Sequence, residues 1–229
     1  MSRQKYLQMV VTLAVLSMPF SANAADAPIN AGAGTTVTVG DNYEIEMTGN
    51  GSTAVAAAQN ANVTLGNDAK ITVDGDSAYG VQTNGENSKI EFGDGAGIEM
   101  TGNAAVGVET SADNSLIKFG ESAEIVLQGD YNYGASVWSE NSSIEFGADA
   151  KITAVSNAVR VGGNDSQAIF GADAILTTSG DNAYTVHLGA ASGSSITFDN
   201  GAVINSDGHA SIGAVSYTHL RAHETLRHL

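Results

Sequence analysis

The chain has 229 residues, with 9 Lys+Arg against 25 Asp+Glu, which gives a formal net charge of −16 at pH 7. This acidity argues against nucleic acid as a partner, because phosphate contacts need a basic face, and against electrostatic docking on anionic lipid. The chain has no cysteine, which excludes disulfides, thiolate metal sites and a cysteine nucleophile.

The first 24 residues have the features of a secretory signal peptide. A basic start precedes an apolar run from Leu7 to Leu16, and Ala22-Asn23-Ala24 supplies small residues at a cleavage site. A transmembrane anchor is the alternative, but the apolar run is shorter than the roughly 20 residues that span a bilayer. We expect export and cleavage after Ala24, followed by a flexible leader over residues 25–34.

A repeat of 27 residues begins at about residue 35. Its clearest copy is Ser88–Asn114, which is preceded by Ala61–Asn87 and followed by Ser115–Asn141 with the same order of residue types. Each copy contains about three short strands with alternating polar and apolar residues, and no helical periodicity.

Three apolar positions of the repeat predict the core. Two come from the first strand of each copy and one from the second, and the three series are Val39, Leu65, Phe92, Phe119, Phe146, Phe170 and Phe198; Val37, Val63, Ile90, Ile117, Ile144, Ala168 and Ile196; and Ile45, Ile71, Ile98, Ile125, Ile152, Leu176 and Ile204. The interval from Phe146 to Phe170 is shorter than the others, and we expect its missing residues to have been lost from the third side of that coil.

One such unit cannot bury its own apolar face, so neighbouring copies must stack. Equivalent positions then lie above one another at about 4.8 Å, the spacing between paired strands. The sequence therefore predicts a parallel β-helix of about seven coils over residues 35–214. Asparagines at 27-residue intervals are predicted to close the coils and to form a side-chain ladder; they are Asn60, Asn87, Asn114 and Asn141.

The pattern stops at about Val215. Residues 215–229 resemble the translated sequencing-adapter tails found on truncated reading frames, and we expect them to be non-native; a genuine helix capping the solenoid is the alternative. His219 and His223 have the spacing of zinc ligands on a helix. Their order with Glu224 differs from the metalloprotease motif, so no metal site is predicted.

No catalytic, cofactor or metal-binding motif stands out elsewhere. Acidic turns such as Asp74-Gly75-Asp76 lack a calcium-binding frame and are expected to be solvated. Lysines occur about once per coil, as on a solvated face. Arg160, in the shortened coil, is the most unusual basic residue, while His187 and His209 are expected at surface or strand positions.

Aromatic residues gather on or near the third side of the coils; they are Tyr79, Tyr131, Tyr133, Trp138 and Tyr184. An exposed set on a flat face would anchor a partner or stack on sugars, whereas alternate members pointing inward would fill core. Both interpretations remain open for Tyr79 and Tyr184. Trp138 is the better contact candidate because polar residues follow it.

The export signal, the Ser-x-Ile-x-Phe-Gly coils and the strand Ala78-Tyr79-Gly80-Val81 resemble the passenger regions of bacterial autotransporters, the type V secretion system. The resemblance covers about residues 35–214 and includes no catalytic motif. It implies an all-β, right-handed parallel β-helix carried to the cell surface through an outer-membrane β-barrel in the full-length protein. Since the sequence contains no barrel-like segments, we expect the chain to be an N-terminal fragment.

We therefore expect a non-enzymatic surface or secreted protein of a Gram-negative-type bacterium, used in adhesion or self-association. Its partner would be a surface ligand or another copy of itself, and no cofactor is implied. Two alternatives remain open: a β-helix lyase or hydrolase acting on polysaccharide, with Arg160 as its candidate residue, and a fragment with no function of its own.

Overall fold

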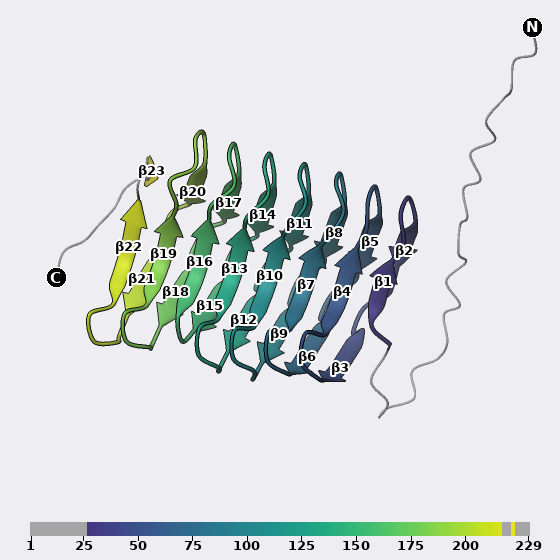
Figure 1. Ribbon diagram of the computed structural model, residues 1–229, viewed down its shortest axis with the longest axis horizontal. Helices are drawn as coiled ribbons and strands as arrows, with labels where there is room; N and C mark the ends of the chain where they lie inside the picture. The colour runs from purple at the N-terminus through teal and green to yellow at the C-terminus, as the bar shows by residue number, and fades with distance from the viewer. Residues whose placement is uncertain (1–26, 217–220, 223–229) are drawn as a thin grey trace, which may run out of the picture.

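The computed structural model describes residues 27–216, 221 and 222. The predicted signal peptide and the residues His219, His223 and Glu224 lie outside the described residues. Every regular element within them is a β-strand (Figure 1). No helix in this described part has the length and hydropathy to cross a bilayer.

The strands form three parallel sheets that wind as a β-solenoid of about seven turns. The first sheet contains β2 (Thr36–Thr38), β5 (Asn62–Leu65), β8 (Lys89–Phe92), β11 (Leu116–Phe119), β14 (Ser143–Phe146), β17 (Gln167–Phe170), β20 (Ser195–Phe198) and β23 (Arg221–Ala222). The second contains β3 (Glu44–Thr48), β6 (Lys70–Asp74), β9 (Gly97–Met100), β12 (Glu124–Leu127), β15 (Lys151–Ala154), β18 (Ile175–Thr178) and β21 (Val203–Ser206).

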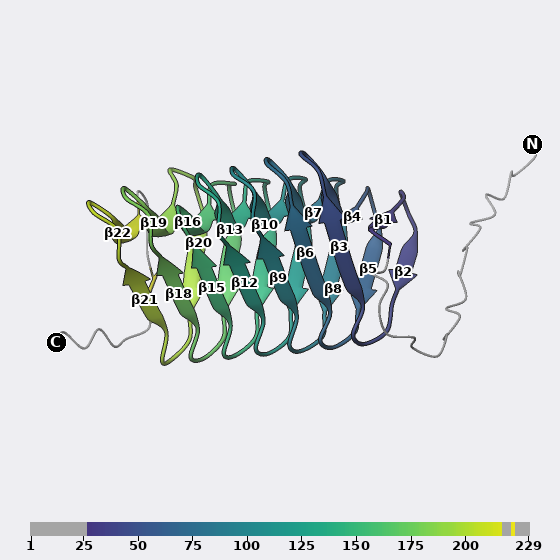
Figure 2. The same ribbon diagram turned by 90° about the horizontal axis from the view of Figure 1, so that it is seen from below.

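The third sheet contains β1 (Ile29–Ala31), β4 (Thr53–Ala57), β7 (Tyr79–Thr83), β10 (Val106–Thr110), β13 (Tyr133–Val137), β16 (Asn157–Val161), β19 (Tyr184–Leu188) and β22 (Ile212–Ser216). It faces the viewer in Figure 1, and Figure 2 shows the second sheet from below. Each inner strand pairs with the equivalent strand one coil earlier and one coil later, so the parallel β-helix predicted from the 27-residue period is confirmed.

The predicted core positions form columns along the solenoid. The rings from Phe92 to Phe198 stack in one series, with neighbouring centroids 4.6, 5.0, 4.9 and 4.9 Å apart. The isoleucine column of the second sheet is buried from Ile45 to Leu176. Only the terminal coils depart from the prediction: Val37 and Val39 are partly buried, and Ile204 is 37% exposed.

The shortened coil loses its residues from a turn. Residues 128–132 connect β12 to β13, whereas only Val155 and Ser156 connect β15 to β16. Strand β16 keeps five residues, so the prediction that the third side itself was shortened is wrong. The strand is kept because its removal would interrupt the backbone hydrogen bonds of both neighbouring coils.

The prediction that asparagines form a side-chain ladder is also wrong, because other residues form it. Asn60, Asn87, Asn114 and Asn141 instead adopt left-handed backbone conformations, with φ of 56°, 57°, 57° and 50°, which asparagine tolerates in tight turns. The side-chain column lies one residue further on, in serines. The backbone N–H of Ser115 donates to Ser142 Oγ at 3.0 Å, and that of Ser142 donates to Ser166 Oγ at 3.1 Å.

The acidic turns have a structural role beyond solvation. The Asp94 carboxylate accepts a hydrogen bond of 2.8 Å from the backbone N–H of Glu121, and Asp76 accepts one of 2.8 Å from Asn103. Each carboxylate thereby holds the turn of the next coil.

Interrupting the phenylalanine stack should lower the stability of the protein considerably. Phe119→Ala removes a fully buried ring and both of its stacking contacts, and should lower the free energy of unfolding by about 3–5 kcal/mol. Urea titration followed by circular dichroism measures this. Lys118→Ala, on the outer side of the same strand, should stay within about 0.5 kcal/mol; equal effects for the two variants would contradict the role of the stack.

Candidate ligand-binding face

The outer face of the third sheet carries the chemically distinctive side chains. In the five-residue strands of the third sheet the first and fourth residues share this face, and the second and third residues point into the core, as the burial of β7 and β19 shows. Stacking of Tyr184 on His187 within β19, with centroids 5.1 Å apart, confirms that both positions lie on one side. We refer to these two lines of residues as the tyrosine row and the polar row.

The tyrosine row is defined by the first residues of the third-sheet strands. The register places Tyr79 beside Val106, Val106 beside Tyr133, Tyr133 beside Asn157 and Asn157 beside Tyr184. The three tyrosines are half-buried, whereas Val106 between two of them is 7% exposed. Of the two interpretations left open for Tyr79 and Tyr184, the structure therefore supports the surface position.

The polar row is defined by the fourth residues of the same strands. From β7 to β19 it contains Gln82, Glu109, Ser136, Arg160 and His187 in consecutive register. Arg160 is the single Lys or Arg in the third-sheet strands. This row was missed at the sequence level, although aligning the third strands by their period would have revealed it.

Trp138 follows β13 and covers the guanidinium of Arg160. The Arg160 Cζ atom lies 3.7 Å from the centroid of the Trp138 ring and 5.7 Å from that of Tyr133. Arg160 also donates from Nη1 to the Tyr133 hydroxyl at 3.4 Å. Such cation–π contacts are favourable when the cation is partly desolvated, so Arg160 is held between two aromatic rings.

Glu109 is a desolvated carboxyl on this face, 8% exposed. Burial raises its pKa above the usual range, while hydrogen bonds from Gln82 and Ser111 act in the opposite direction. The bond from Gln82 Nε2 measures 3.2 Å. Burial, and then the charge of Glu109, also raise the pKa of Tyr79.

His187 lies beside Arg160 in the register. Burial, and then the positive charge of Arg160, lower the pKa of His187 below its usual value. A neutral imidazole at neutral pH follows, with one ring nitrogen able to donate and the other to accept. His209, the other histidine considered, lies in an exposed turn outside the face.

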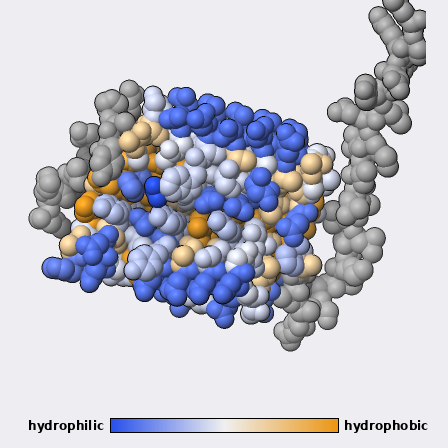
Figure 3. Space-filling view, viewed as in Figure 1, coloured by the Kyte–Doolittle hydropathy of each residue, from blue (hydrophilic) through white to orange (hydrophobic). Residues whose placement is uncertain are grey.

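Hydrophilic turns border the face on both sides. Figure 3 shows two strongly hydrophilic bands along the solenoid, with a paler band of intermediate hydropathy between them. The turns that precede the third-sheet strands include Asp76 and Asn103, and the turns that follow them include Asp113 and Glu140. Tyr131, which is 78% exposed, belongs to a turn and not to the face.

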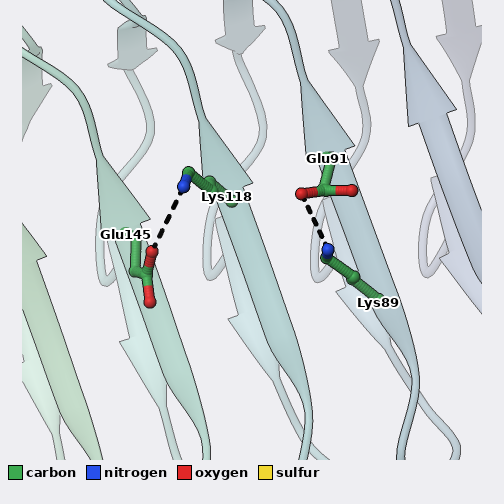
Figure 4. A network of polar contacts seen from close by, with 4 residues as sticks. All are labelled: Lys89, Glu91, Lys118 and Glu145. Atoms are coloured by element: carbon green, nitrogen blue, oxygen red, sulfur yellow. Dashed lines mark ion pairs between the residues drawn. The ribbon is translucent and has the colours of Figure 1, made fainter.

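The first sheet presents a different, charged outer surface. Lys89 pairs with Glu91 at 2.8 Å, and Lys118 pairs with Glu145 at 3.8 Å (Figure 4). Exposed pairs of this kind contribute little to stability. Two further lysines, Lys70 and Lys151, are exposed on the second sheet, so the lysines are solvated as expected but do not share one face. Within residues 27–216, 221 and 222, no three His, Cys, Asp or Glu side chains gather in a way that could hold a metal ion.

In comparisons with known proteins, no family model, curated protein or solved structure matches the chain. The class that the structure itself defines is a parallel β-solenoid with one aromatic outer face.

Trp138 is the only tryptophan of the chain, so its fluorescence reports directly on the contact with Arg160. Arg160→Ala should increase acrylamide quenching and shift the emission to longer wavelength, because the ring loses its packing partner. Arg160→Lys should give an intermediate result, since an ammonium lacks the planar stacking surface. Lys151→Ala, on the second sheet, is the control; unchanged quenching in Arg160→Ala would contradict the assigned contact.

The buried carboxyl predicts a pH-dependent effect on stability. Because the folded-state pKa of Glu109 is raised, its contribution to stability is complete below the unfolded pKa and is lost as pH rises through the folded pKa. Glu109→Gln should therefore be more stable than the wild type near neutral pH, and this advantage should shrink toward about pH 4. Urea unfolding at both pH values measures it, with exposed Glu124→Gln as the matched control. A constant difference across pH would refute the assignment.

Proposed function

We propose that this chain is the exported, non-enzymatic binding region of a surface protein of the autotransporter type, and that it acts in adhesion through the outer face of its third sheet. The observation that carries this proposal is the alignment of three tyrosines and Trp138 on one flat face of a rigid solenoid. Aromatic side chains provide large contact area at low conformational cost and are enriched where proteins bind partners.

The rigidity of the scaffold supports this function. The backbone of each inner coil is hydrogen-bonded to the coils before and after it, so the face is formed before a ligand arrives. Binding to a preorganised surface avoids much of the entropic cost of ordering side chains and loops.

The charge of the chain favours adhesion over self-association. A formal net charge of −16 makes copies of the chain repel one another, and the hydrophilic turns that border the third sheet include acidic residues such as Asp76 and Asp113. We therefore assign the face to a ligand other than the chain itself.

The test is to express the full chain in a Gram-negative host and to measure its binding to arrays of extracellular proteins and glycans. We expect an exported product that begins at Ala25 and binds at least one class of ligand. Trp138→Ser should weaken binding by about fivefold or more, whereas Tyr131→Ser, which changes an aromatic residue outside the face, should leave it unchanged. Cytoplasmic retention, or equal loss in both variants, would refute the proposal.

A β-helix enzyme acting on polysaccharide is the second candidate, because Arg160 donates to the Tyr133 hydroxyl and has His187 beside it in the register. A base beside a charge-stabilising group is the arrangement that β-elimination needs. This candidate requires turnover of a glycan that Arg160→Ala abolishes, and the binding proposal requires none. Absence of product across a broad panel of acidic and neutral glycans would eliminate the enzyme.

A further inference from the structure

The tyrosine row has a period of its own, distinct from that of the solenoid. Tyrosine occupies the first position of β7, β13 and β19, whereas the intervening strands β10 and β16 begin with Val106 and Asn157. With about 4.8 Å between coils, the rings are about 10 Å apart along the axis, and the row spans about 19 Å.

Side chains of the polar row fix the environment of Tyr133 and Tyr184. Arg160 donates to the hydroxyl of Tyr133 at 3.4 Å, and the ring of His187 stacks on Tyr184 at 5.1 Å between centroids. Tyr79 has Val106 as its neighbour in the register, and Gln82, the fourth residue of its own strand, donates to the carboxyl of Glu109. The rings of Tyr133 and Tyr184 are thus held by side chains of the polar row, as a preorganised binding row requires.

The interval between the rings selects among extended ligands. In an extended peptide, side chains on one face are about 7 Å apart, so they do not match rings that are about 10 Å apart. A nucleic acid is disfavoured by the acidic charge of the chain. An extended glycan presents the same apolar sugar face once per disaccharide, an interval close to the separation of these rings.

The charges of the face further restrict the glycan. Arg160 is the one cation in the third-sheet strands, and Trp138 already covers its guanidinium at 3.7 Å. The chain as a whole carries −16, which repels a polyanion. Half-buried Gln82 and His187 nevertheless place polar groups beside the rings, which suits the hydroxyl groups of an uncharged sugar, whereas Glu109 and Ser136 of the same row are buried.

We propose that the third-sheet face binds a neutral, extended oligosaccharide lying along the solenoid axis, with alternate sugar units stacked on Tyr79, Tyr133 and Tyr184. This inference deepens the proposed adhesive function and rests on it. The two-coil interval of the rings determines which glycans fit, and the half-buried members of the polar row, Gln82 and His187, contact their hydroxyl groups.

The experiment is isothermal titration calorimetry of the full chain with cellohexaose, chitohexaose and xylohexaose, their disaccharides, and hexagalacturonate as the anionic probe. At least one neutral hexasaccharide should bind, more tightly than its disaccharide and more tightly than hexagalacturonate. Tyr133→Ala should weaken binding by about tenfold or more, Tyr133→Phe by less than about threefold, and Tyr131→Ala not at all. Circular dichroism confirms that each variant remains folded.

A second variant tests the interval itself. Tyr133→Ala combined with Asn157→Tyr restores the number of rings but moves the middle one by one coil. Binding should remain as weak as in Tyr133→Ala; recovery would show that aromatic content alone matters and would overturn the proposal.

Two further outcomes separate this inference from the function on which it rests. Tighter, salt-sensitive binding of hexagalacturonate, or no binding of any neutral hexasaccharide, overturns the neutral-glycan assignment. If an extracellular protein then still binds and Trp138→Ser weakens it, the adhesive function stands without the glycan. If no array ligand binds at all, both fail.

Discussion

In-register parallel pairing is the constraint on which the rest of this structure depends. Once each strand pairs with its equivalent one coil away, every residue must tolerate a near-identical environment at about 4.8 Å above and below it. Phenylalanine meets this requirement by stacking its rings, and serine meets it by accepting from the next backbone N–H. Most turns meet it with a left-handed residue, supplied by asparagine at positions such as Asn87 and Asn114, and the shortened connection between β15 and β16 is an exception.

Much of the fold could be predicted because the period and the strand alternation agree. The Phe and Ile columns follow directly from residues 27 apart, and only positions at the ends, such as Ile204, deviate because no described coil covers them. The position of the deletion could not be predicted, since the strands of the third side are rich in small residues and alternate weakly. The asparagines were misassigned because a left-handed turn and a side-chain ladder produce the same spacing in sequence.

The face was only partly visible in the sequence. The sequence shows that Tyr79 and Tyr184 are aromatic, but not that they face outward, because the second and third residues of these strands are both buried and simple alternation fails there. Glu109 was not identified, since a glutamate in a strand normally signals a solvated position. Its burial is created by the neighbouring coils, so it becomes apparent only when the register is known.

The difference between the one-coil and two-coil periods has a consequence for how such proteins change length. Duplication or loss of a single coil leaves the core columns intact, because every coil presents the same inward residues. The same event within the tyrosine row displaces the rings beyond it by one strand and puts them out of phase. Gain or loss of an even number of coils preserves both the core columns and the phase of the tyrosine row. An odd number preserves only the core columns.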